Sequence, residues 1–277
     1  MSMQLTILCD NSVRARPGLI GEHGFACHIA THNKQYLFDT GNGLGLLNNA
    51  RTCGIDLKSI DAVLLSHGHW DHCGGLMDLL GLRNDQVTPV YAHPAMFDHK
   101  VSADPNRTRN IGCGFRRLQA EAAGAIFHFS TAPVKLPGGL IFSGEIPKKL
   151  DQTSDDNLCH ISAGSLLCDP LLDDQSLYLL SDSGLVVLCG CAHSGVRNIL
   201  AHSLSLTNNA KIHALIGGLH LAFNDTEQNQ TILSDLLGYQ VQHLALSHCT
   251  GQDAITEFKN SLGRTVTSGS VGSKFSF

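Results

Sequence analysis

Short apolar runs alternate along the chain with longer segments of helical length, which is the pattern of an α/β protein. Residues 4–10 are predicted to form a first strand, and residues 25–30 and 35–39 a hairpin. A helix is predicted to extend as far as Cys53 and Gly54. No low-complexity segment or linker interrupts this pattern, so the chain is expected to form one domain.

Four of the apolar runs end in small residues and a histidine, and helix-length segments separate them. These runs cover residues 61–65, 184–189, 213–218 and 243–247, and the histidines that follow them are His67, His193, His220 and His248. In α/β sheets, functional residues gather at the carboxyl ends of the strands. The pattern therefore predicts that these strand-end histidines belong to a functional site.

The densest group of ionisable side chains follows the first of these runs. Residues 66–72 contain three imidazoles and one carboxylate, on His67, His69, Asp71 and His72. Neutral imidazole nitrogens and ionised carboxylate oxygens are ligands that borderline metals such as zinc prefer. His67 and His69 can hold one ion from an extended loop, whereas Asp71 and His72 can hold a second ion or a water molecule. A purely structural role would crowd four ionisable groups together at a cost and for no gain.

Composition limits the classes of function. The 277 residues are 43% apolar, enough for a sizeable core, and their net charge of −5 argues against a broad nucleic-acid surface. Neither a signal peptide nor a run of roughly eighteen apolar residues is visible, so no membrane partner is expected. The ten cysteines lack the spacing of a disulfide scaffold, and we expect reduced thiols in a cytoplasmic protein. Cys189 and Cys191 are too close together for the usual zinc pair.

The His-x-His-x-Asp-His sequence at residues 67–72 resembles the signature of the metallo-β-lactamase superfamily of metal-dependent hydrolases. The blocks at residues 189–195, 217–221 and 248–251 resemble the subgroup named for 7,8-dihydropterin-6-methyl-4-(β-D-ribofuranosyl)aminobenzene-5′-phosphate synthase. This resemblance implies an α/β fold, an αββα sandwich of two mixed sheets with helices outside and metals on one edge. We expect a single domain over residues 1–277, built from two similar halves.

The resemblance also implies a set of metal ligands. The first metal is expected on His67, His69 and His193, and the second on Asp71, His72 and His248. Many hydrolases of this superfamily place a bridging aspartate between the third and the last histidine, where this chain carries His220. A neutral imidazole cannot bridge two cations, so His220 is expected to be either a direct ligand or a catalytic group that serves the substrate. Asp39 is expected to support the histidine loop from behind the ligands.

Residues 97–117 are expected to form an irregular insertion over the active-site mouth. This segment carries Arg107, Arg109, Arg116 and Arg117. These guanidinium groups either clamp a phosphate or carboxylate of the substrate or belong to a solvated surface loop.

The expected activity is metal-dependent hydrolysis by two zinc ions per chain, with iron or manganese as alternative metals. A zinc-bound water has a pKa of about 7, and Asp71 is expected to orient the resulting hydroxide or carry its proton. The expected substrate is a small anionic ester or phosphoester, and the resemblance implies a link to pterins. Two alternatives are an iron-dependent thiol dioxygenase on the same fold and a non-catalytic sensor that binds a metal or ligand.

Overall fold

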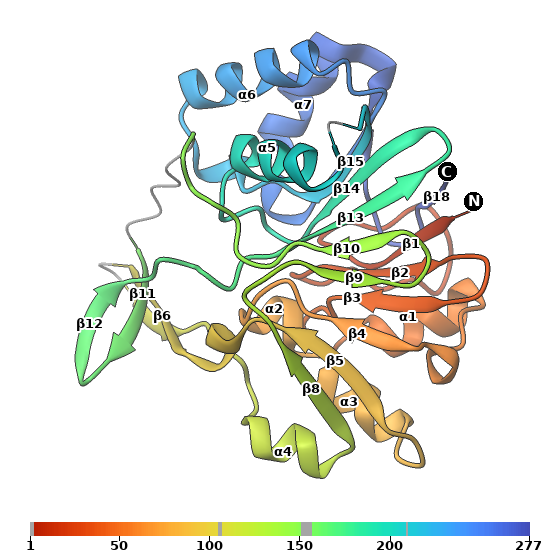
Figure 1. The fold of residues 1–277 in the computed structure, drawn as a ribbon, viewed down its shortest axis with the longest axis vertical. Helices are drawn as coiled ribbons and strands as arrows, with labels where there is room; N and C mark the ends of the chain where they lie inside the picture. The colour runs from red at the N-terminus through yellow and green to blue at the C-terminus, as the bar shows by residue number, and fades with distance from the viewer. Residues whose placement is uncertain (1–2, 105–106, 151–156, 209) are drawn as a thin grey trace.

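The computed structural model describes residues 3–104, 107–150, 157–208 and 210–277. Two seven-stranded β-sheets lie face to face, and helices cover the outer side of each sheet (Figure 1). Each sheet contains both antiparallel and parallel neighbours. The expected αββα sandwich of two mixed sheets with helices outside is therefore confirmed.

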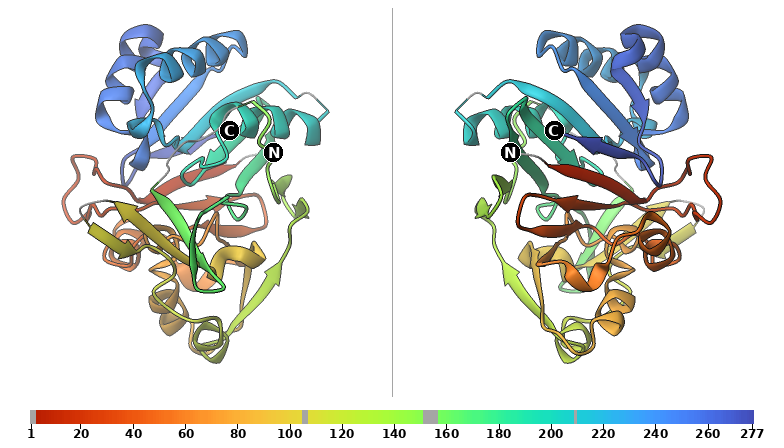
Figure 2. Two further views of the ribbon diagram at one scale, coloured as in Figure 1. Left: turned by 90° about the vertical axis from the view of Figure 1, so that its left-hand side faces the viewer. Right: turned by 90° about the vertical axis from the view of Figure 1, so that its right-hand side faces the viewer.

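The two sheets change from antiparallel to parallel pairing in the same way. In the first sheet, the strands in spatial order are β18 (Lys274–Ser276), β1 (Gln4–Cys9), β2 (Ala26–Ala30), β3 (Gln35–Phe38), β4 (Ala62–Leu64), β5 (Thr88–Ala92) and β8 (Ala125–Phe129). In the second sheet, they are β17 (Val266–Ser268), β16 (His243–Ser247), β15 (Ile212–Gly218), β14 (Gly184–Cys189), β13 (Ser176–Ser181), β10 (Leu140–Phe142) and β9 (Val134–Leu136). Strands β1 and β18 lie side by side at the edge of the first sheet (Figure 2).

The helices connect the parallel strands across the outer faces. The first sheet is accompanied by α1 (Leu46–Cys53), α2 (Trp70–Cys73), α3 (Leu76–Leu82) and α4 (Arg117–Ala122). The second sheet is accompanied by α5 (Val196–Leu206), α6 (Thr226–Gly238) and α7 (Gln252–Leu262). None of the described helices has the length and apolar character needed to cross a membrane.

Strand β14 shows why the central strands are apolar throughout. Val186 and Leu188 pack in the core between the two sheets, whereas Leu185 and Val187 pack under the helices of the second sheet. All four side chains are buried because both faces of this sheet are covered. Each such side chain contributes about 1.5–3 kcal/mol on burial, so the strand is held firmly in the position from which it delivers its last residues.

Residues 97–117 are more regular than predicted. They contain β6 (His99–Asp104) and β7 (Arg107–Asn110), which form a hairpin. With β11 (Leu158–Ser162) and β12 (Ser165–Cys168), this hairpin makes a four-stranded sheet at one side of the sandwich (Figure 1). Strand β6 pairs with β11, which is far away along the chain, so no local pattern reveals the pairing.

Candidate metal centre

Parallel strands bring the candidate residues to one edge of the sandwich. Strand β4 of the first sheet ends just before the loop at residues 66–72. In the second sheet, the neighbouring parallel strands β14, β15 and β16 end shortly before His193, His220 and His248. The carboxyl ends of parallel strands share one edge, and the two sheets face each other there. The loop of the first sheet therefore meets the strand ends of the second.

Three histidines form a first group of converging donors. One ring nitrogen from each of His67, His69 and His193 lies within 4.8 Å of the other two. His67 Nε2 is 3.0 Å from His69 Nδ1. The ring centroid of His193 lies 4.9 Å from that of His67 and 5.0 Å from that of His69. All three side chains are buried, and we call these residues the first triad.

Asp71, His72 and His248 form a second group beside the first. Asp71 Oδ2 lies 3.3 Å from His248 Nε2 and 3.9 Å from His72 Nε2. The two histidine nitrogens are 3.3 Å apart. These residues are also buried, and we call them the second triad. The structure thus brings together all six residues that the resemblance implies as ligands, in the two expected groups.

Hydrogen bonds to residues outside the second triad determine which ring nitrogens of its histidines face the centre of the triad. The buried Asp39 carboxylate accepts a 2.8 Å hydrogen bond from His72 Nδ1, so His72 Nε2 keeps its lone pair. His248 Nδ1 likewise donates to Asn11 Oδ1 at 2.9 Å, which leaves the lone pair on His248 Nε2. Together with Asp71 Oδ2, three electron-pair donors face one another. A shared proton or a bound cation is required to balance the repulsion between these three lone pairs.

Asp39 also orients the first triad. Its carboxylate accepts hydrogen bonds from the backbone nitrogen and the hydroxyl of Ser66, both at 2.7 Å. Because the Ser66 hydroxyl hydrogen points to Asp39, its oxygen accepts from His67 Nδ1 at 2.9 Å. His67 Nε2 therefore presents its lone pair to the other members of the triad. The expected supporting role of Asp39 is visible in these contacts.

The electrostatics of the second triad favour a positive charge. Burial lowers the pKa of His72, but Asp71 and Asp39 outweigh burial and raise that pKa to about 9. Burial raises the pKa of Asp71, yet His72 and hydrogen bonds from His23 and His248 hold it well below its usual range. Without a metal, the second triad therefore keeps a proton on His72 at neutral pH.

The first triad is neutral instead. Burial lowers the pKa of His69 to about 4, well under the ordinary histidine value of about 6.5. Burial, and then the neighbouring histidines, lower the pKa values of His67 and His193 as well. Neutral imidazole is the form that binds metals, so this triad is ready to bind without releasing a proton.

The spacing of the donor atoms fits a metal of the size of zinc. Two ligands at about 2.0–2.1 Å from a tetrahedral ion are about 3.3 Å apart. This is the separation of His72 Nε2 and His248 Nε2, and the nitrogens of His67 and His69 are only slightly closer. Imidazole and carboxylate ligands also suit iron and manganese. The donor set is therefore that of a transition-metal site.

His220 lies next to the triads. Its ring centroid is 4.4 Å from that of His193, and its ring stacks on Phe223 at 4.5 Å. Its φ of 55° is left-handed, a conformation that costs a non-glycine residue about 1–3 kcal/mol and is typical of functional sites. Gly217 lets β15 reach this point, since a Cβ there would lie 1.9 Å from Cys189 O. The converging donor groups found among the described residues do not include His220.

A cavity of about 300 Å³ opens beside His220. Apolar side chains of Leu219 and Ile232 line part of it. Two acidic residues, Asp225 and Glu227, line another part. Arg197 also lines it, so the cavity is large enough for a small organic group and carries charged side chains of both signs.

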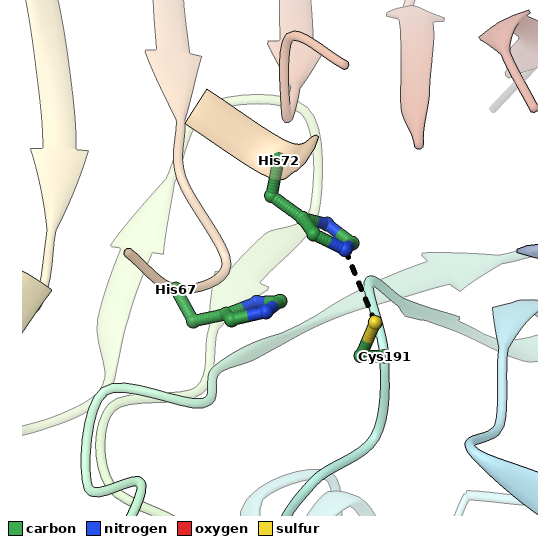
Figure 3. A group of neighbouring side chains, drawn as sticks. All are labelled: His67, His72 and Cys191. Carbon is green, nitrogen blue, oxygen red and sulfur yellow. Dashed lines mark hydrogen bonds between the residues drawn. The ribbon is translucent and has the colours of Figure 1, made fainter. Parts of the chain in front are cut away.

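Two residues at the triads were not predicted. Cys191 Sγ lies 3.1 Å from His72 Nε2 (Figure 3). The spacing of Cys189 and Cys191 does not predict a zinc pair, but Cys191 stands two residues before the strand-end histidine His193, and this position is a signal in the sequence. His23 Nε2 lies 3.2 Å from Asp71 Oδ2, and its side chain is 55% exposed. His23 belongs to a loop without a motif, so no local sequence signal could have found it.

Arginines from the 97–117 segment lie on the surface. Arg117 forms an ion pair with Glu121 at 2.7 Å and lies over the ring of Phe129. Arg116 and Arg109 are also exposed, and the side chain of Arg107 lies outside the described residues. Figure 1 places α4, which begins at Arg117, at the lower end of the molecule, away from α2, which contains Asp71 and His72. These positions match the solvated alternative for Arg116 and Arg117.

A buried network of charged side chains connects the loop at residues 66–72 to the four-stranded sheet. Lys100 Nζ on β6 lies 2.9 Å from Asp169 Oδ2 and 2.8 Å from Asp173 Oδ1. Asp173 Oδ2 accepts a 2.8 Å hydrogen bond from the backbone nitrogen of Gly68. Gly68 separates two ligands of the first triad, and a Cβ there would lie 1.9 Å from Met96 O. The third sheet therefore helps to set the position of the loop.

Comparison with known proteins finds similarity to the β-lactamase superfamily. A family model described as the β-lactamase superfamily domain matches residues 34–131. The 7,8-dihydropterin-6-methyl-4-(β-D-ribofuranosyl)-aminobenzene-5′-phosphate synthase of Methanocaldococcus jannaschii is 29% identical over 258 residues, covering 88% of this chain and 87% of the relative.

Two further matches agree with this similarity. The hydroxyacylglutathione hydrolase of Psychromonas ingrahamii is 24% identical over 211 residues, covering 74% of each chain. The crystal structure of a metal-dependent hydrolase of the β-lactamase superfamily superimposes with a TM-score of 0.85 and 28% identity. That match covers 99% of this chain and 98% of the other.

Proposed function

Because this chain is similar to proteins of the β-lactamase superfamily in sequence and in fold, we propose that it is a hydrolase of this superfamily that holds two zinc ions, one on each triad. The observation that carries this proposal is the second triad, in which Asp71, His72 and His248 direct three electron pairs at one point. The neutral first triad beside it supports a second ion. Zinc is preferred because the 3.3 Å separation of His72 Nε2 and His248 Nε2 matches its tetrahedral geometry.

The residues around the second triad provide a path for a proton. Bound zinc would supply a water with a pKa of about 7 and would polarise the scissile bond. Asp71, whose carboxylate is almost entirely buried, would orient this water and relay its proton without keeping it, because His72 and His23 hold the pKa of Asp71 well below its usual range. His23 lies 3.2 Å from Asp71 Oδ2 and is exposed, so it can pass the proton on to solvent.

The proposed substrate is a small anionic ester or phosphoester. The anionic end would point toward the metals, and an uncharged organic part would occupy the cavity beside His220. The apolar side chains of Leu219 and Ile232 in that cavity support this orientation. The similar synthase of M. jannaschii has a pterin and a ribose phosphate in its name, which makes pterin-related phosphoesters the first compounds to test.

The test compares metal-free protein with protein reconstituted with zinc, on a panel of phosphodiesters, phosphomonoesters, carboxylic esters and lactones. We expect turnover of at least one anionic member only after zinc is added, with two zinc ions per chain by mass spectrometry. Two bound ions without any turnover would contradict hydrolysis and favour a metal- or ligand-binding sensor. Turnover of thiols that needs iron and oxygen would favour the dioxygenase, and product formation only by condensation would favour a synthase.

The two triads are expected to respond differently to pH. The proton on His72, whose pKa is about 9 without metal, must leave before the second triad binds an ion. Affinity there should fall about tenfold for each pH unit below 9, because protons compete with the metal. The first triad should bind equally well at pH 9 and pH 6, since burial holds the pKa of His69 at about 4. Cobalt titrations at both pH values check this, and an equal loss at both sites would contradict it.

His220 is expected to serve the substrate. Its ring faces His193 but stands outside the converging donor groups, so His220→Ala should leave the metal content unchanged. The turnover number kcat should fall by about 10²-fold, the lower end of the range for a positioned acid or base. Metal content and kcat measured on one preparation decide between the two roles. Loss of one metal ion would identify His220 as a ligand.

A further inference from the structure

The thiol of Cys191 lies between the two triads. Its Sγ is 3.1 Å from His72 Nε2, and a nitrogen of His67 lies within 4.8 Å of both atoms (Figure 3). On its other side, Sγ lies within 4.8 Å of the donor atoms of His248 and Cys249. Cys191 thus neighbours one ligand of the first triad and two ligands of the second.

The backbone holds this thiol in place. Cys191 is 3% exposed and lies two residues after the end of β14 at Cys189. Gly190 packs so closely on the Asp39 network that a Cβ would lie 2.3 Å from Ser66 Oγ. Ala192 has a φ of 59°, and this left-handed turn lets Cys191 and His193, two residues apart, both face the site. Such a strained non-glycine residue needs support from its surroundings and is typical of functional sites.

The balance of charge at the proposed dinuclear site favours a further anionic ligand. Two zinc ions would bring four positive charges, and Asp71 is the one carboxylate in the two triads. His220, which lies beside His193, is a neutral group and adds no negative charge. Asp39 contributes a negative charge only from behind His72. A buried excess of positive charge is costly, and a cysteine thiolate is both anionic and a strong zinc ligand.

We propose that Cys191 Sγ is a seventh metal ligand, which binds the ion on the second triad from the side that faces His67. This inference rests on the proposed dinuclear site and adds a ligand to it. Metal binding forms the bond to sulfur and releases the S–H proton to solvent. The thiolate makes the site softer, so it should select zinc, cobalt or iron over manganese and magnesium.

Cobalt reports directly on this ligand. A thiolate bound to Co²⁺ gives a charge-transfer absorption band in the near ultraviolet, which imidazole and carboxylate ligands do not give. We would titrate metal-free protein with cobalt and record the band for the native chain and for Cys191→Ser and Cys249→Ser. Cys249 is the matched control, because it is the other thiol in the cluster and its sulfur accepts a hydrogen bond from the His220 backbone nitrogen.

The expected result is a band that reaches its full height with the second cobalt ion. Cys191→Ser should lose the band and bind the second ion at least about tenfold more weakly, while the first ion binds as before. Cys249→Ser should keep the band. Two bound ions without a band in the native chain would overturn the inference but leave the proposed function standing. In that case the short contact is a hydrogen bond from the thiol to His72 Nε2.

Two other outcomes also decide the matter. A band that persists in Cys191→Ser and disappears in Cys249→Ser would assign the sulfur ligand to Cys249 and overturn the inference. A native chain that binds no cobalt would overturn the proposed function first, and the inference with it. Thermal unfolding without metal shows whether each serine variant is folded.

Discussion

Replacement of His67 with alanine is expected to remove most of the bound metal and to lower kcat/KM by at least about 10³-fold. His67 Nε2 faces His69 at 3.0 Å, and the ring of His67 also lies 4.2 Å from that of His72, so its loss weakens both triads. A catalytic metal supplies several kcal/mol of transition-state stabilisation, and each 1.4 kcal/mol is about tenfold in rate. Mass spectrometry of the metal content and turnover of a panel substrate check this result.

The matched control is His28→Gln. His28 is also buried in a strand of the first sheet, but its Nε2 contacts Gln35 Oε1 at 2.9 Å and none of the donor atoms. This variant is expected to keep its metal and its activity. A His67→Ala protein with full metal content and normal turnover would show that the first triad is misassigned.

Replacement of Lys100 with methionine is expected to lower the free energy of unfolding by about 3–5 kcal/mol, the usual result of removing one partner from a buried ion pair. The change leaves the buried carboxylates of Asp169 and Asp173 without their cation. It also releases the loop, because Asp173 holds the Gly68 backbone nitrogen. Urea unfolding with excess zinc in every sample measures the difference.

Lys34→Met provides the comparison at the surface. Lys34 Nζ lies 2.7 Å from Asp61 Oδ1, but the two side chains are 37% and 33% exposed. Exposed pairs of this kind contribute less than about 1 kcal/mol. An equal loss of unfolding free energy in the two variants would mean that the buried Lys100 network stabilises the fold no more than an exposed ion pair does.

Much of the site could be predicted because its densest part is local. Four of the candidate ligands fall within residues 66–72, so the expected chemistry of the loop is visible without knowledge of the fold. His193 and His248 are far away in sequence, and the strand-end pattern and the family resemblance identified them. The apolar runs likewise predicted β4, β14, β15 and β16, since strands buried on both faces are apolar throughout.

The unpredicted parts depend on contacts between distant segments. Nothing in the local sequence distinguishes Lys100 from an ordinary surface lysine, and only the fold brings it into contact with Asp169 and Asp173. His23 meets Asp71 in the same way. The spacing of Cys191 from Cys189 gives no sign of its contact with His72, which lies 119 residues away in the sequence and in the other half of the sandwich. Local patterns report neighbours in the chain, and these three roles arise from neighbours in space.

The pairing of β1 with β18 has a consequence for synthesis of the protein. Leu5 lies opposite Phe275, and Asp10 Oδ1 accepts a 2.7 Å hydrogen bond from the backbone nitrogen of His248. Such contacts between distant segments slow folding, and ribosomes add only about 5–20 residues per second. Until the last strands emerge, β1 therefore remains an open sheet edge, and open edges promote aggregation. The second triad includes His248, which follows β16, so a nascent chain that stalls before β16 would be prone to aggregate and would lack a complete second triad.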